Sequence, residues 1–488
     1  MTIHTSAGNV AGRVDADGIQ SFLGIPFAAP PVGHLRFEPP HPPEPWTTVR
    51  DATEYGPTAP HLESTGVLSA IIPDVTRPGD DFLNLNIWTA DPLGSAPVMV
   101  FVHGGSFTSG SGSVVGYDGS HFARHGVVLV TINYRLAADG FLWFGEGMPN
   151  LGMLDQVAAL EWVRDNIAAF GGDPRNVTVF GESAGAMSVG ALLVMPAAKG
   201  LFHRAILESG AGHHSISAES ARLVGTRLAE ILGVQPSREA IAGVPIAQLL
   251  EAQAQVGREL TAKPKPALWG DVADKGLPFL PVVDGSVLPS APIDALVSGA
   301  SSDVDILIGN NTEEAGLLLT PGNKIASMPK WLVYLAARQA RLPFGGVRTY
   351  FRGMPRAKAS AVLVSILTDY LYRIPAIRLA EAHPKSFVYE FDWGTPAFDG
   401  ALGACHGVEL PFVFDNLASS DWAGMTGATA PQLLADEVHG AWVEFARTGN
   451  PGWERYAEPS RVARRFGTPS ATTNDDRRAE REVWAGIR

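Results

Sequence analysis

Cysteine is almost absent from this sequence, because Cys405 is the single cysteine among 488 residues. No disulfide can form within such a chain, which excludes the small secreted folds that depend on disulfide bonds. The first residues show neither a basic stretch nor an apolar segment of the kind that opens a secretory signal. We therefore expect a cytoplasmic protein.

Positive charge is also in short supply, since 37 Lys and Arg residues face 50 Asp and Glu residues, for a net charge of −13. A diffuse acidic balance disfavours nucleic acid and anionic membrane surfaces as partners. The sequence shows no apolar run of the ~18 residues that a membrane-spanning helix needs. It also shows no metal-ligand cluster and no phosphate-binding glycine loop, so we expect no metal, no cofactor and a small-molecule partner. The oligomeric state is not indicated.

What the chain does contain is an alternating pattern of short apolar strands and helices. Hydrophobic residues make up 45% of the chain, enough for a large core. The pattern predicts strands at 98–102, 127–132, 176–180, 204–208, 305–309 and 386–391, and helices at 155–170, 186–194 and 432–447. Such alternation predicts an α/β fold, with a mostly parallel central sheet and helices on both faces. Residues from about 213 to 300 and from 325 to 382 are predicted as helical insertions over the active site, and the tail as irregular.

A serine stands between glycines in the segment Gly181–Gly185, which reads Gly-Glu-Ser-Ala-Gly. Residues 177–180 before it predict a strand, and residues 186–194 after it predict a helix. A Gly-x-Ser-x-Gly turn in this setting holds its serine in a strained conformation, with the hydroxyl at a helix N-terminus that favours negative charge. We therefore predict that Ser183 is a nucleophile; the alternative is an ordinary glycine-rich turn.

A second glycine loop, His103–Ser106, follows the predicted strand at 98–102. A tetrahedral intermediate on Ser183 would carry a negative oxygen that needs hydrogen-bond donors already in place. In loops of this type the donors are backbone N–H groups, together with the N–H of the residue after the nucleophile. The candidate donors are Gly105, Ser106 and Ala184; the alternative is a turn with no role.

A serine nucleophile needs a base, and on this kind of sheet the chain order is serine, acid, histidine. His406 lies in a loop after the predicted strand at 386–391, where a parallel sheet places its site. The rival His439 falls in a predicted helix. The strand at 305–309 leads to Glu313 and Glu314, and either carboxylate could orient the histidine. Spacing alone does not choose between them.

Taken together, these motifs resemble the type B carboxylesterases, the group that includes the cholinesterases. The resemblance covers nearly the whole chain, and it rests on residues 22–31, 150–156, 170–174, 181–185, 406–414 and 445–451. It implies an α/β-hydrolase fold as one catalytic domain over residues 1–488. It also implies hydrolysis of carboxylic esters through an acyl-enzyme, with no cofactor. Matched residue by residue, it assigns the nucleophile to Ser183, the base to His406 and the acid to Glu314, not Glu313.

The same resemblance assigns the oxyanion donors to Gly105, Ser106 and Ala184. Ser106 departs from the family pattern, because the family usually has a third glycine at this position. A backbone donor survives that change, but we expect the added side chain to narrow the pocket. Hydrolysis of tertiary-alcohol esters, which relatives with three glycines can carry out, is therefore in doubt.

Two other functions deserve comparison with ester hydrolysis. One is a binding protein on the same scaffold that has lost catalysis, which the presence of all three triad residues disfavours. The other is the same chemistry on an amide or a carbamate. We expect acyl and alcohol specificity to depend on the helical insertions and loops, including residues 331–344 and the surroundings of Phe412.

Overall fold

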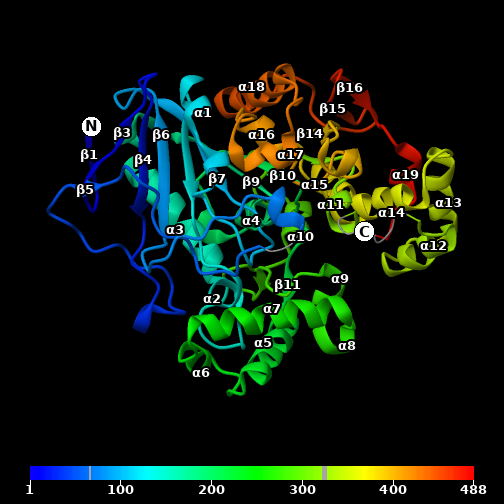
Figure 1. Ribbon diagram of the computed structural model, residues 1–488, viewed down its shortest axis with the longest axis horizontal. Helices are drawn as coiled ribbons and strands as arrows, with labels where there is room; N and C mark the ends of the chain where they lie inside the picture. The colour runs from blue at the N-terminus through cyan, green and yellow to red at the C-terminus, as the bar shows by residue number, and fades with distance from the viewer. Residues whose placement is uncertain (65–66, 321–326, 488) are drawn as a thin grey trace.

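The protein is built around one large twisted sheet (Figure 1). The computed structural model describes residues 1–64, 67–320 and 327–487, so residues 325 and 326 of the second predicted helical region lie outside the described residues. The strand order is β16-β15-β14-β13-β10-β9-β7-β8-β6-β4-β3. These strands are β3 (Arg13–Val14), β4 (Gln20–Pro26), β6 (Asn84–Thr89), β7 (Ala96–Val102), β8 (Val128–Ile132), β9 (Gly172–Glu182), β10 (Arg204–Glu208), β13 (Asp305–Asn311), β14 (Ser386–Phe391), β15 (Val462–Phe466) and β16 (Ala471–Asn474).

The middle of the sheet is parallel. Every neighbouring pair from β8 through β7, β9, β10, β13 and β14 to β15 runs in the same direction. Antiparallel strands close both edges, with β6, β4 and β3 on one side and β16 on the other. Two small sheets lie apart from it, formed by β1 (Thr2–Thr5), β2 (Gly8–Ala11) and β5 (Arg50–Asp51), and by β11 (Ile216–Ser217) and β12 (Val282–Val283). The prediction of a mostly parallel central sheet is confirmed.

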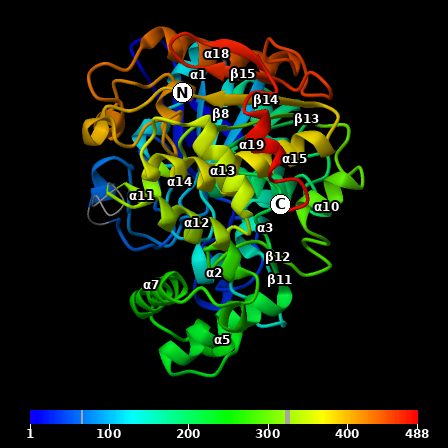
Figure 2. The same ribbon diagram turned by 90° about the vertical axis from the view of Figure 1, so that its right-hand side faces the viewer.

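Helices cover both faces of the sheet and extend beyond one end of it. Figure 2 shows α5 and α7 projecting below the sheet, while α12 to α15 lie toward the viewer. The helices are α1 (Ser120–Arg124), α2 (Ala137–Phe141), α3 (Leu151–Asn166), α4 (Ala184–Leu192), α5 (Ala218–Leu232), α6 (Arg238–Ala242), α7 (Ile246–Ala262), α8 (Pro266–Trp269), α9 (Val272–Lys275), α10 (Pro292–Val297), α11 (Gly316–Leu319), α12 (Lys330–Gln339), α13 (Phe344–Gly353), α14 (Ala359–Thr368), α15 (Ile374–Ala382), α16 (Leu410–Val413), α17 (Ala423–Thr426), α18 (Gln432–Thr448) and α19 (Arg478–Glu482).

Side chains along the buried strands point alternately to the two faces of the sheet, and the core therefore forms two layers. In β7, Val100 belongs to the layer that contains α3 and α4, whereas Phe101 belongs to the layer that contains α18. Successive strand residues point to opposite faces, so both faces of this strand must be apolar. This explains why the central strands read as continuous apolar runs.

One helical stretch, Ala359–Ala382, is long and apolar enough to cross a membrane by length and composition alone. It comprises α14, a π-helical turn at Asp369–Arg373, and α15. The sequence pattern did not single it out, because charged residues of that turn interrupt the apolar run. Inside the protein 72% of its most apolar window is buried, so these apolar side chains pack within the fold.

The prediction of an irregular tail is wrong. β15 adds to the sheet beside β14, β16 pairs with β15, and α19 follows. β15 was missed because Arg464 and Arg465 interrupt its apolar pattern. The guanidinium of Arg465 lies 3.0 Å from a carboxylate oxygen of Asp392, so an ion pair accompanies this part of the strand.

The register of the parallel strands brings their carboxyl ends to one edge. Val102 is level with Gly181, Glu208 with Glu182 and Gly309, and Asn311 with Phe391. The loops that leave β7, β9, β10, β13 and β14 therefore meet at this edge, which is where open α/β sheets place their ligand sites.

Candidate active site

Ser183 occupies a tight turn between β9 and α4. Its backbone φ of 54° and ψ of −120° lie in a region that residues with side chains rarely adopt. The turn crosses β7 closely, since a Cβ atom on Gly185 would lie 1.9 Å from the carbonyl oxygen of Val102. The Ser183 N–H donates to the carbonyl of Glu208 over 2.9 Å. Glycine is therefore required at Gly185 for the strand and helix to hold the serine in this position.

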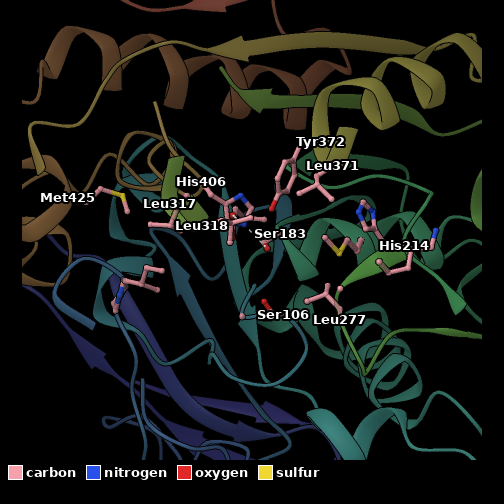
Figure 3. Close-up of a pocket in the computed structure, with 18 of the residues that line it drawn as sticks. Ser106, Ser183, His214, Leu277, Leu317, Leu318, Leu371, Tyr372, His406 and Met425 are labelled. Atoms are coloured by element: carbon pink, nitrogen blue, oxygen red, sulfur yellow. Dashed lines mark hydrogen bonds and ion pairs between the residues drawn. The ribbon is translucent and has the colours of Figure 1, made fainter. Parts of the chain in front are cut away.

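The structure brings the predicted serine and histidine together. His406 Nε2 lies 2.8 Å from Ser183 Oγ, within hydrogen-bond distance (Figure 3). His406 comes from the loop after β14, and the ring of Tyr372 lies over it at a centroid distance of 5.0 Å. The rival His439 is buried in α18, where Nδ1 contacts the carbonyl of Val413 at 2.8 Å. Burial lowers the pKa of His439 to about 4, as expected for a neutral core residue.

Of the two candidate acids, the structure places Glu314 against the histidine. Glu314 Oε2 lies 2.6 Å from His406 Nδ1, and the Glu314 side chain is fully buried. Its other oxygen accepts hydrogen bonds from Ser209 Oγ at 2.5 Å and from the Asn311 N–H at 2.7 Å. Glu313 is exposed and accepts the Ala404 N–H at 2.9 Å. A serine, a histidine and a buried carboxylate thus form one hydrogen-bonded chain.

The glycine loop after β7 lies directly against the serine turn. A Cβ atom on Gly104 would come within 3.2 Å of Ser183 Cβ, so the two backbones approach closely. Gly105 has φ 108° and Ser106 has φ 57°, which places a non-glycine residue in the left-handed region. In the described part of the chain, the N–H groups of Gly105, Ser106 and Ala184 donate to no protein acceptor. The predicted oxyanion donors are thus available to a ligand.

His103 supports this loop through contacts with Tyr134 and Gly104. Its ring stacks on Tyr134 at a centroid distance of 4.5 Å, and Nδ1 donates to the carbonyl of Gly104 at 2.7 Å. Burial lowers the pKa of His103 to about 4, so the ring is neutral. His103 therefore supports the loop as an uncharged group.

Three further buried glutamates surround the triad, and sequence reasoning missed them. Glu182 Oε1 lies 3.1 Å from His406 Nε2, Glu409 accepts Asn311 Nδ2 at 2.5 Å, and Glu208 accepts Trp442 Nε1 at 2.8 Å. Burial raises the pKa of each carboxyl, and neighbouring carboxylates raise the pKa values of Glu208 and Glu409 further. The sequence held a local indication for two of them, because Glu182 is the variable residue of the Gly-x-Ser-x-Gly turn and Glu409 follows His406 by three residues.

Two of the carboxylates at the site, Glu182 and Glu314, change the pKa of His406. Burial alone lowers the pKa of His406, but Glu182 and Glu314 raise it, because both carboxylates stabilise the imidazolium. Ser209 Oγ connects the group, since it lies 2.5 Å from Glu314 and 3.3 Å from Glu409. The site is therefore arranged to stabilise positive charge on His406.

A cavity of about 500 Å³ opens over Ser183. Its wall is mostly apolar, and the apolar residues that line it include Ile72, Pro73, Met187, Leu277, Leu317, Leu318, Leu371, Trp422 and Met425. Residues 331–344 are not among its lining residues, and Phe412 is fully buried against Phe391 and Trp393. The two predicted insertions do contribute to the wall, through Leu277 and Leu371 among others, and the dependence of specificity on them stays a prediction. Apolar lining of this kind suits an uncharged ester.

The described residues contain no group of three or more His, Cys, Asp or Glu side chains arranged to hold a metal ion. A serine hydroxyl, a histidine base and a set of backbone donors are the components of nucleophilic acyl transfer.

Known proteins are similar to this chain over nearly its whole length. The model of the carboxylesterase family matches residues 1–463. The para-nitrobenzyl esterase of Bacillus subtilis (strain 168) is 37% identical, over 98% of this chain and 97% of its own length. The phenmedipham hydrolase of Pseudarthrobacter oxydans is 36% identical, over 92% and 90%. The crystal structure of a Geobacillus stearothermophilus carboxylesterase superimposes with a TM-score of 0.86 and 37% identity, covering 99% of both chains.

Proposed function

The chain belongs to the carboxylesterase family, and from this we propose that Ser183 is its nucleophile, His406 its general base and Glu314 the acid that orients the base. The protein is a carboxylic ester hydrolase of the serine type, with an α/β-hydrolase fold. One observation carries the assignment of the residues. A single hydrogen-bonded chain runs from Ser183 Oγ through both nitrogens of His406 to the buried carboxylate of Glu314.

In the first half of the reaction, His406 Nε2 accepts the proton of Ser183 as Oγ attacks the ester carbonyl. The carbonyl oxygen becomes an oxyanion, which accepts hydrogen bonds from the N–H groups of Gly105, Ser106 and Ala184. The loss of one such donor typically costs ~10²–10³ in rate. His406 then passes its proton to the departing alkoxide, and the acyl group remains on the serine.

In the second half, His406 accepts a proton from water, and the resulting hydroxide attacks the acyl-enzyme. The carboxylic acid leaves, and Ser183 regains its proton. Glu314 holds the Nδ1–H tautomer throughout, so that Nε2 is free to accept. Glu182, 3.1 Å from Nε2, adds to the stabilisation of the imidazolium that forms in both halves.

Labelling with a fluorophosphonate probe, combined with hydrolysis of p-nitrophenyl butyrate, tests the assignment. Ser183→Ala should abolish labelling and lower kcat by ~10⁴ or more. Ser298→Ala is a suitable control, because Ser298 is exposed and its hydroxyl bonds only the carbonyl of Asp294 within its own helical turn. Full activity or undiminished labelling of Ser183→Ala would refute the proposal.

The two alternative functions are not favoured. The assembled nucleophile, base and acid disfavour an inactive binding protein, and the relatives above are named as esterases and hydrolases. For the bond that is cleaved, we expect an ester to be hydrolysed faster than the matched amide, which a paired rate measurement decides.

We also propose that the enzyme acts in the cytoplasm. The support is chemical: the chain has one cysteine, Cys405, which is buried and free, so the fold needs no oxidising compartment. Cell fractionation with an antibody against the chain is the direct test, and recovery from the secreted fraction would contradict it.

A further inference from the structure

Positive charge, which is scarce in the chain as a whole, is concentrated in one segment. Residues 327–368 contain seven Lys and Arg residues and no Asp or Glu, whereas the whole chain has a net charge of −13. The seven basic residues, all of them exposed, are Lys330, Arg338, Arg341, Arg348, Arg352, Arg356 and Lys358. The overall acidic balance, which disfavoured an anionic membrane as a partner, therefore does not describe this segment.

The same segment exposes large apolar side chains. Trp331 is 64% exposed, Leu335 57% and Phe344 62%. On α12 the spacing of Trp331, Leu335 and Arg338 places these three side chains on one helix face, opposite the buried Val333. An apolar side chain that stays in water contributes nothing to folding, so a cluster of them on one face indicates a surface that binds a partner.

Helix α13 continues this face. Phe344 and Arg348 are four residues apart on α13, and the Arg348 guanidinium lies 5.5 Å from the centre of the Phe344 ring. The ring of Tyr334 on α12 stacks on Phe344 at a centroid distance of 4.3 Å, which joins the two helices. Figure 1 shows both helices at the right-hand end of the molecule. The α12–α13 surface, as we call it, consists of Lys330, Trp331, Leu335, Arg338, Phe344 and Arg348.

The cations of the α12–α13 surface are not neutralised by acids. Within the described residues, none of its three cations forms an ion pair, and the aromatic rings beside Lys330 and Arg348 carry no net charge. The neighbouring Arg341 is paired with Asp274 at 2.7 Å, so that this acid is engaged outside the surface. Glu480 of α19 lies beside the last residue of α13, about 14 Å along the helix axis from its first residue.

We propose that the α12–α13 surface binds the enzyme peripherally to an anionic lipid bilayer. Trp, Phe and Leu side chains next to Lys and Arg are typical of helices that lie in the membrane interface. The apolar side chains enter the boundary of the acyl chains, and the cations contact the anionic head groups. This inference goes beyond the proposed function, because membrane binding needs neither Ser183 nor His406.

A second copy of the chain fits the surface less well. In a symmetric dimer the same face of each copy meets its counterpart. The three cations of one copy would then face the three cations of the other, and like charges repel when they lose contact with water. An anionic bilayer offers both an apolar layer for Trp331 and Phe344 and the negative charge that the cations lack.

The α12–α13 surface is one helix layer away from the cavity over Ser183. Helix α12 packs on α14, and α14 leads into the π-helical turn whose Leu371 and Tyr372 line the cavity. Leu318 of α11 also lines the cavity and is largely exposed, so the cavity wall reaches solvent there. An apolar ester concentrates in a bilayer. An enzyme bound to that bilayer meets its substrate at a higher local concentration.

Flotation with lipid vesicles tests the inference. The native enzyme should float with vesicles of phosphatidylcholine and phosphatidylglycerol in equal parts, not with phosphatidylcholine alone, and added salt should release it. The double variant Lys330→Gln and Arg338→Gln should lower the partition coefficient about twentyfold, since each basic residue near an anionic surface contributes about fivefold. The double variant Trp331→Ser and Leu335→Ser should lower it about tenfold or more.

Matched controls come from other helices. Arg258→Gln with Lys265→Gln removes the same charge from α7 and the turn that follows it. Leu433→Ser removes an apolar side chain of α18 that is even more exposed but lies one turn from Asp436. Both controls should bind the anionic vesicles as the native enzyme does. Ser183→Ala should also bind them fully, which separates membrane binding from the proposed function.

Equal flotation with both kinds of vesicle would overturn the inference, as would equal binding by an α12 variant and its control. A native enzyme that ignores the vesicles and forms a dimer, which Trp331→Ser with Leu335→Ser dissociates, would also overturn it and assign the surface to a second copy. The α12 variants should hydrolyse p-nitrophenyl butyrate in solution at the native rate, because residues 330–344 are not among those that line the cavity. This measurement also verifies that the variants are folded.

Discussion

The most informative single substitution is Glu314→Gln, because it changes one charge and almost no volume in the triad. Glu314 Oε1 accepts from Ser209 Oγ and the Asn311 N–H, and Oε2 accepts from His406 Nδ1. A glutamine has one acceptor oxygen and one NH₂ group. If its oxygen faces Asn311, the NH₂ faces Nδ1 and forces the proton of the neutral imidazole onto Nε2.

The wrong tautomer cannot accept the Ser183 proton. Rotating the glutamine by 180° does not help, because the NH₂ would then face the Asn311 N–H, donor against donor. Locking a histidine base in the wrong tautomer costs about 10⁴ in kcat, as documented for the aspartate-to-asparagine change in a serine protease triad. That factor corresponds to roughly 5.5 kcal/mol of transition-state stabilisation. KM should change little, because Glu314 does not line the cavity.

Steady-state hydrolysis of p-nitrophenyl butyrate measures both parameters. Glu313→Gln is the matched control, since Glu313 is the adjacent acid, is exposed, and bonds the Ala404 N–H instead of the histidine. It should keep kcat within about twofold. Thermal melting of both variants excludes unfolding as the cause. A Glu314→Gln enzyme with more than a tenth of the native kcat, or an equal loss in Glu313→Gln, would refute the reasoning.

Three further outcomes follow from the structure. Burial lowers the pKa of His406, and the carboxylate of Glu182 raises it. Glu182→Gln should therefore lower the pKa of His406. Because only neutral His406 accepts a proton, the acid limb of the kcat/KM profile should move to lower pH. An unmoved limb would contradict this. Ser106→Gly removes a side chain at φ 57° in the donor loop and should raise the rate on tert-butyl relative to n-butyl acetate at least tenfold, about 1.4 kcal/mol; a constant ratio would show that Ser106 does not limit the pocket. Arg135→Met leaves Asp155, 2.7 Å away and fully buried, without its partner, and should lower the free energy of unfolding by about 3–5 kcal/mol in urea denaturation.

The sequence by itself was sufficient for the parts of the site that are local in the chain. The turn at Ser183 requires a strand, two glycines and a helix in direct succession, and all of them are adjacent in the sequence. The same holds for the donor loop at Gly105 and Ser106. Alternation of strands and helices was enough to predict the parallel sheet, because each parallel pair needs a crossover.

Spacing alone did not choose between Glu313 and Glu314, and the family resemblance was needed for that assignment. The reason is physical: neighbouring residues in a loop point in different directions, and their burial depends on what the rest of the chain places around them. In the structure Glu314 is enclosed by Ser209 and His406, whereas Glu313 faces solvent.

Only the tertiary structure revealed the cluster of Glu182, Glu208 and Glu409 around the triad. Glu182 and Glu409 lie close in the sequence to Ser183 and His406, but Glu208 is on another strand, and only the register of the sheet brings the three carboxylates together. The cavity wall was hidden for the same reason. The wall includes Lys275 but none of residues 331–344. The sequence could not show this, because aromatic residues on a helix give the same pattern whether they face a pocket or pack elsewhere. Local sequence determines how a turn is built, while long-range packing decides which side chains share its surroundings.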